Sequence, residues 1–371
     1  MRSPGEGLGV ALAAAVLLGS ASPSPAQAPP PPRYVILVTF DGVRPTDFFG
    51  GMDSTVAAFA DSSGIQDSAR TWQEFWRPTV AARRRALMPF FWDSLAPLGM
   101  VLGDPASGGR ASTANEEGFS APGYLEMLTG EAQPTVTSND PVRYPFRTVL
   151  QYARHTLHLG TGQVATFASW ENFRSYVASR DGDVFVNAGY DGIPEPFVTP
   201  ELDRLVTLQS RALPAWEESR LDAFTGELAL EYLKRHHPRV LFVSFNDTDD
   251  YAHLRRYDRV LSALHANDLF LRDLWHAVQA SPRYRNRTTL IITTDHGRGR
   301  TGATWPHHGR DTPGSREIWM AIIGPFTPNG GGAGLDVTQS QVAATLLACL
   351  GLDPAGFSGT AAPPVPGACH P

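Results

Sequence analysis

The sequence predicts an α/β fold, a three-layer α/β/α sandwich with a mostly parallel central sheet. Apolar, β-branched runs of strand length recur along the chain, as is typical of strands buried on both faces. They alternate with longer helical patterns, the order expected for a parallel sheet covered by helices. The chain has 371 residues, 42% of them hydrophobic and 18% charged. This composition is that of a globular protein with a sizeable core.

The first residues have the pattern of an export signal. Residues 1–28 combine a positive end, an apolar run over residues 8–18 and the cleavage-type triplet Ala26-Gln27-Ala28. Cleavage after Ala21 is an alternative, as is an uncleaved anchor, although the apolar run is too short to span a membrane. Residues 29–33 form a Pro-rich spacer, and residues 34–371 a single domain. We therefore expect an exported protein, periplasmic or extracellular and of bacterial type, with no membrane span in the mature chain.

The predicted elements follow in order along the domain. Strands are expected at residues 34–40, 100–103, 164–168, 184–187, 239–245, 288–294 and 318–323. Helices are expected within 66–97, from Pro122 to Thr129-Gly130, at 143–158, twice within 202–235, at 257–280 and at 339–350. The segment between Asp41 and Ser120 is extended and is a candidate for shaping a substrate pocket.

Metal-ligand residue types follow three of these strands. Asp41 ends the first, Asp295 and His296 end the sixth, and His308 comes soon afterwards. After the fifth strand, Asp249 and His253 are four residues apart, which places them on one face of a helical turn. Carboxylate and imidazole at the carboxyl ends of parallel strands indicate a ligand site that suits zinc. Each residue also has a structural alternative, such as a turn or cap.

Two neighbouring residues are rivals for these positions. Asp247 competes with Asp249, but its offset from His253 does not fit one helical face. His307 competes with His308, and the sequence pattern alone does not separate them.

Ser120 lies where a helix is predicted to begin. Backbone N–H groups and the helix dipole at such an end favour an anion and lower the cost of an alkoxide. The alternative is an ordinary N-cap serine, the commonest use of Ser there.

Charge and cysteine content narrow the function classes. The net charge is -6, so the sequence predicts no nucleic-acid-binding surface. Lys234 is the one lysine in the chain, which excludes a P-loop. Export would place Cys349 and Cys369 in an oxidising compartment, and both a bridge and two free thiols stay open.

Five stretches together carry a resemblance to a known family: residues 35–42, 119–130, 249–253, 293–297 and 307–311, with 321–325 as support. Over residues 34–355 the chain resembles the alkaline phosphatase superfamily, in its nucleotide pyrophosphatase/phosphodiesterase-like branch. The resemblance implies that residues 34–371 are a catalytic domain with a two-zinc centre.

The resemblance also implies residue roles. Asp41, Asp295 and His296 hold one zinc together with Ser120, and Asp249, His253 and His308 hold the other. His308 is preferred to His307 because the family ligand directly precedes glycine. Ser120 is the nucleophile, although the branch has Thr before Phe-Pro where this chain has Ser before Ala-Pro. Asn139 falls near an Asn that binds a phosphoryl oxygen.

The implied function is an exported, metal-dependent hydrolase that acts on a small phosphorylated substrate through a phosphoseryl intermediate. Tyr124 occupies the position of the arginine that sulfatases need for their formylglycine, which argues against a sulfatase. The alternatives are an inactive phosphate-ligand-binding protein and a phosphoryl transferase to an acceptor other than water. Diester or broad phosphatase activity is favoured, while the native metal and the oligomeric state stay open.

Two further sets of side chains are candidates for substrate contact. Positive charge could come from Arg44, Arg298 and Arg310. An aromatic wall could come from Tyr124, Tyr251 and Trp305. The alternatives are solvated loop arginines and aromatic core packing.

Overall fold

The computed structural model describes residue 5, residues 33–59 and residues 64–369. The predicted signal segment, apart from residue 5, and residues 29–32 of the predicted spacer lie outside the described residues, so both stay predictions. Within the described part, no helix has both the length and the apolar character needed to cross a membrane.

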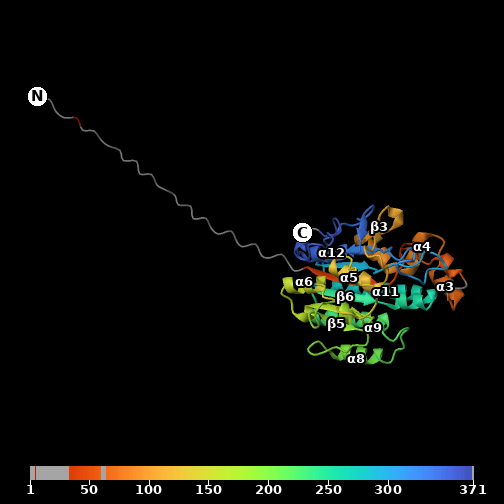
Figure 1. Ribbon diagram of the computed structural model, residues 1–371, viewed down its shortest axis with the longest axis horizontal. Coiled ribbons are helices and arrows are strands. Elements are labelled where there is room, and N and C mark those ends of the chain that lie inside the picture. Colours follow the sequence, from red (N-terminus) through yellow and green to blue (C-terminus); the bar gives the residue numbers. More distant parts are fainter. Residues whose placement is uncertain (1–4, 6–32, 60–63, 370–371) are drawn as a thin grey trace. The chain divides into compact units, whose positions relative to one another are not determined.

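A seven-stranded, mostly parallel sheet forms the centre of the fold (Figure 1). Its strands, from one edge to the other, are β2 (Gly99–Leu102), β8 (Met320–Ile323), β7 (Thr288–Thr293), β1 (Tyr34–Phe40), β6 (Val240–Phe245), β4 (Val164–Ala168) and β5 (Phe185–Ala188). β8 is antiparallel to both of its neighbours, and the remaining pairs are parallel. A short parallel pair, β3 (Arg110–Ser112) and β9 (Asp336–Thr338), lies apart from this sheet.

Helices cover both faces of the sheet, which confirms the predicted fold class. Along β1 the side chains of Ile36 and Val38 join one apolar core, while those of Val35 and Leu37 join the other. The first core also contains side chains of α9 (Asp222–His236) and α11 (Tyr257–Ala280). The second contains side chains of α5 (Ser120–Thr129), α6 (Val149–Thr156) and α12 (Gln341–Leu350). Two buried faces explain why the strand sequences are continuously apolar.

The remaining helices are short: α1 (Pro45–Gly50), α2 (Ser54–Ala57), α3 (Ser68–Phe75), α4 (Val80–Leu87), α7 (Phe173–Tyr176), α8 (Pro200–Gln209) and α10 (Asp247–His253). The predicted helix at 143–158 begins only at Val149, because Thr148 and Gln151 form a reciprocal capping box. The helical stretch expected over 66–97 is divided between α3 and α4, and its last part is a π-helical turn at Phe91–Leu95 and a 3-10 turn at Ala96–Leu98.

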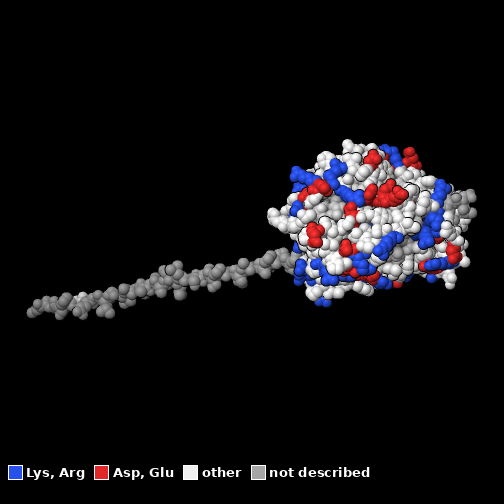
Figure 2. Space-filling view, turned by 90° about the horizontal axis from the view of Figure 1, so that it is seen from below, with Lys and Arg blue, Asp and Glu red and all other residues white. Residues whose placement is uncertain are grey.

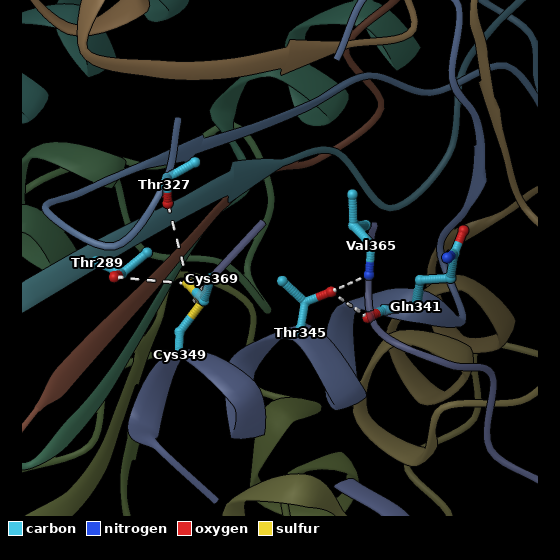
Figure 3. The surroundings of a disulfide bond; sticks show 7 residues. All are labelled: Thr289, Thr327, Gln341, Thr345, Cys349, Val365 and Cys369. Atoms are coloured by element: carbon cyan, nitrogen blue, oxygen red, sulfur yellow. Dashed lines mark hydrogen bonds between the residues drawn. A yellow bond between two sulfur atoms is a disulfide. The ribbon is translucent and has the colours of Figure 1, made fainter. Parts of the chain in front are cut away.

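A disulfide joins Cys349, in α12, to Cys369 in the C-terminal tail (Figure 3). The Thr345 hydroxyl fixes the same tail, because it accepts the Val365 N–H at 2.9 Å and donates to the Gln341 carbonyl at 2.7 Å. Of the two alternatives left by the sequence, the structure has the bridge.

Candidate active site

The first group of candidate metal ligands lies at the carboxyl ends of β1 and β7. These strands are parallel neighbours, with Thr39 opposite Thr293, so Asp41 and Asp295 emerge side by side at one sheet edge. His296 follows directly. All three side chains are buried, and one ligand atom from each lies within 4.8 Å of those of the others.

The second group is formed by α10 and a loop after β7. Asp249 and His253 occupy the same face of α10, and the His253 Nε2 atom lies 3.0 Å from Asp249 Oδ2. His308 Nε2 lies 3.0 Å from His253 Nε2. The rival His307 is exposed, and Asp247 instead accepts a hydrogen bond from the Asp222 backbone. Neither rival belongs to a candidate ligand group of the described residues.

Ser120 is the first residue of α5 and faces the first group. Its Oγ lies 3.5 Å from Asp41 Oδ1 and 3.4 Å from His296 Nε2. Phe119 is the N-cap, so Ser120 does not have the alternative N-cap role. The helix approaches this closely because residue 123 is glycine: a Cβ atom there would lie 2.5 Å from the Asp295 carbonyl oxygen.

Several buried side chains hold the ligand groups in place. The Tyr124 hydroxyl donates to Asp41 Oδ2 at 3.0 Å, and the Thr248 hydroxyl donates to the Asp41 carbonyl at 2.6 Å. Arg298 donates to the Asp249 carboxylate and, at 2.6 Å, to the Pro306 carbonyl. Tyr124 and Arg298 therefore hold the carboxylates of candidate metal ligands in position, which corrects the idea that they contact substrate. Nothing in the sequence pattern marked Thr248.

For the other candidate substrate contacts, the structure favours the alternatives of an ion-paired arginine or aromatic packing. Arg44 is buried and pairs with Asp47 at 2.7 Å, and Trp305 is buried against Tyr257 with ring centroids 5.2 Å apart. Arg310 is exposed and pairs with Glu116 at 2.9 Å. Tyr251 does not line the pocket beside Ser120.

The electrostatics of both groups fit a divalent cation. Burial and the charge of Asp41 raise the pKa of Asp295 to about 8. Its Oδ2 atom is buried and has no hydrogen-bond partner among the described residues. Burial, with the nearby His296, Arg298 and His253, lowers the pKa of His308, so the imidazole is neutral and its lone pair is available. A bound cation would satisfy the carboxylate oxygen and accept the imidazole lone pairs, as zinc does.

A pocket of about 710 Å³ opens beside Ser120 and the second group. Asn139 lines it, and the Asn139 Oδ1 atom accepts the Ala121 N–H of α5 at 2.9 Å. Its wall also contains residues that the sequence analysis missed: Trp170, Glu171, Asn172, Trp216 and Glu218. Trp170 follows strand β4 at the carboxyl edge of the sheet, and this position could have marked it as a pocket residue from the sequence. None of the described residues between Asp41 and Ser120 lines this pocket, so the segment's candidate role in shaping a substrate pocket stays a prediction.

Comparison with known proteins agrees with this geometry. The model of the family "Type I phosphodiesterase / nucleotide pyrophosphatase" matches residues 133–307. This range contains Asn139, Asp249, His253, Asp295 and His296, and it excludes Asp41, Ser120 and His308. No curated protein matches the chain.

Two solved structures illustrate the fold. The lipoteichoic acid synthase LtaP from Listeria monocytogenes is 10% identical, with a TM-score of 0.55, and the match covers 86% of this chain and 72% of that one. A putative sulfatase from Bacteroides thetaiotaomicron VPI-5482 is 13% identical, with a TM-score of 0.53, and the match covers 86% of this chain and 71% of that one. The family match confirms the resemblance seen in the sequence and the expected class of enzyme, a hydrolase of phosphoric esters. The similar structures confirm the fold alone.

Proposed function

From this chain's place in the alkaline phosphatase superfamily, in the phosphodiesterase/nucleotide pyrophosphatase-like branch, we propose an exported, two-zinc phosphoric ester hydrolase with Ser120 as nucleophile. One observation carries the proposal. The Ser120 Oγ, at a helix N-terminus, lies within 3.5 Å of both Asp41 and His296, beside a pocket that Asp249 and His253 also line. Residues 34–371 form the proposed catalytic domain.

The proposed metal ligands are Asp41, Asp295, His296 and Ser120 at one ion, and Asp249, His253 and His308 at the other. When bound, two such ions supply positive charge for the serine alkoxide, the phosphoryl oxygens and the departing oxygen. Tyr124 and Arg298 keep the Asp41 and Asp249 carboxylates oriented toward the site.

Ser120 acts in two in-line steps. Its Oγ attacks phosphorus, a P–O bond forms, and the bond to the leaving alcohol breaks, which gives a phosphoseryl enzyme. The α5 N-terminus favours negative charge on the oxygens that surround phosphorus. The Asn139 amide binds a non-bridging oxygen, since its Oδ1 is occupied by the Ala121 N–H and its amide nitrogen is a donor. Water then attacks phosphorus and releases Ser120, so configuration is retained overall.

Two alternative functions use the same site. An inactive protein could hold a phosphate ligand there, and a transferase could pass the phosphoryl group to an acceptor other than water. Product analysis with added acceptor alcohols separates the transferase from the hydrolase, because the transferase forms a new ester in place of inorganic phosphate or a monoester.

The test measures metal content and turnover together, for the wild type and Ser120→Ala. The substrates are 4-nitrophenyl phosphate, bis(4-nitrophenyl) phosphate and 4-nitrophenyl sulfate. We expect about two zinc ions per chain, and a loss of turnover of at least about thousandfold in Ser120→Ala while the metal stays bound. Ser262→Ala is the matched control, since Ser262 is exposed on α11 and its hydroxyl donates to the Asp258 carbonyl. A wild-type protein without metal and without turnover would refute the proposal.

A further inference from the structure

The pocket beside Ser120 is acidic and aromatic. The acidic side chains of its wall are Asp140, Glu171, Glu218, Asp249 and Asp250, and its aromatic ones are Trp170 and Trp216. None of the described residues that line it is a lysine or an arginine. Away from the proposed metal ligands Asp249 and His253, the group attached to a phosphoryl at Ser120 therefore meets carboxylates and indole rings and no lysine or arginine.

Two chain segments build this wall together. Trp170 and Ser219 form an antiparallel bridge, and the Glu171 N–H donates to the Glu218 carbonyl at 3.0 Å. The Trp170 ring also packs against Tyr176, with the ring centroids 5.7 Å apart. The backbones of residues 170, 171 and 218 and the Trp170 ring are thus held in fixed relative positions beside the nucleophile.

The wall carries negative charge that the protein does not compensate. Glu171 is paired with Arg174 at 2.8 Å, and Asp249 with Arg298. Among the described residues, no ion pair involves Glu218 or Asp140, and both are exposed at the pocket. Carboxylates disfavour an anionic substituent, whereas a cation gains from both the carboxylates and an indole face.

Resting on the proposed function, we infer that the substrate is a phosphoric ester whose alcohol part carries a positive charge, an amino or quaternary ammonium group. Trp170, Trp216 and Glu218 bind this group. The volume of about 710 Å³ also has room for a second substituent, as in a diester. A substrate with a further phosphate or carboxylate on this side is disfavoured.

The experiment compares three phosphoric diesters that share a 4-nitrophenyl group and differ in the charge of the second alcohol. These alcohols are the cationic choline, its neutral isostere 3,3-dimethylbutanol and the anionic 4-hydroxybutanoate, which gives the 3-carboxypropyl ester. We expect kcat/KM for the choline ester to exceed that for the isostere about tenfold, the size of one well-placed cation–π contact. The anionic ester should be the poorest substrate. Glu218→Gln and Trp216→Ala should each reduce the preference, mainly through KM. Glu217→Gln, next in sequence but outside the pocket wall, is the matched control and should keep it.

The outcomes separate the two proposals. Equal kcat/KM for the choline ester and its isostere, with turnover that still requires Ser120, overturns the inference and leaves the proposed function intact. The inference is also overturned if Glu218→Gln and Trp216→Ala keep the full preference for the choline ester, because the pocket wall would then not cause that preference. No Ser120-dependent turnover of any ester overturns the proposed function and the inference with it.

Discussion

Tyr124→Phe tests whether a buried hydroxyl holds a metal ligand in place. The Tyr124 hydroxyl donates to Asp41 Oδ2 at 3.0 Å and is fully buried. Burial, with Asp295 and Asp41, raises the pKa of Tyr124 well above its usual value, so the phenol stays protonated and remains a donor. The phenylalanine ring fits the same space, so the substitution removes this hydrogen bond and the weaker one that the Tyr124 hydroxyl accepts from the Ser244 hydroxyl at 3.3 Å.

The expected change in metal affinity follows from the hydrogen bond between the Tyr124 hydroxyl and Asp41. A hydrogen bond to a charged group contributes about 1.5–3 kcal/mol, and loss of a partner that orients a metal ligand lowers metal affinity about 10- to 100-fold. We therefore expect Tyr124→Phe to release zinc at a free-metal concentration about 10- to 100-fold higher than the wild type does. The assay is competition with a chelator of known affinity, with bound metal measured at each free-metal concentration.

Tyr232→Phe is the matched control. Tyr232 is also buried, and its hydroxyl donates to the Gly162 carbonyl at 3.0 Å, away from the ligand groups. It should lose a similar amount of stability and keep wild-type metal affinity. Equal zinc release by wild type, Tyr124→Phe and Tyr232→Phe would refute the role given to Tyr124. Urea unfolding of all three metal-free proteins separates changes in metal affinity from changes in stability.

Three other changes have defined outcomes. Replacing both Cys349 and Cys369 by serine should lower the free energy of unfolding by about 3 kcal/mol, because their sequence separation is 20; an unchanged urea midpoint would contradict this. Gly123→Ala should lower kcat/KM at least about tenfold, because the new Cβ clashes with the Asp295 carbonyl oxygen and forces Ser120 away from Asp295. Circular dichroism should show that the fold is retained, and wild-type activity would count against the prediction. Burial raises the pKa of Asp268 from 3.8 to about 6, so the folded state binds the proton more tightly than the unfolded state. As pH rises from 4 to 7, the wild type should therefore lose about 2.4 kcal/mol of stability relative to Asp268→Asn; parallel pH curves would disprove it.

The sequence alone indicated the sheet and the candidate ligands at its carboxyl edge, while the family resemblance supplied their division into two groups. Strands buried on both faces have continuous apolar runs, so β1, β6 and β7 were visible as local patterns. Because their parallel carboxyl ends share one edge, Asp41, Asp249 and Asp295 could be expected to meet there. The spacing between Asp249 and His253 depends only on local helix geometry. These features follow from short-range periodicity, which a single sequence contains.

The tertiary structure alone decided which side chains surround that edge. By residue type and position, Tyr124 and Arg298 were candidates for substrate contact. In the folded protein both are buried, and they donate hydrogen bonds to the carboxylates of Asp41 and Asp249. Trp216 and Glu218 reach the pocket from a loop between α8 and α9, and long-range contacts place that loop there, among them the bridge between Trp170 and Ser219 and the bond from the Glu171 N–H to the Glu218 carbonyl. The physical reason is that loop position and side-chain burial depend on long-range contacts, which leave no periodic pattern in the sequence of either partner.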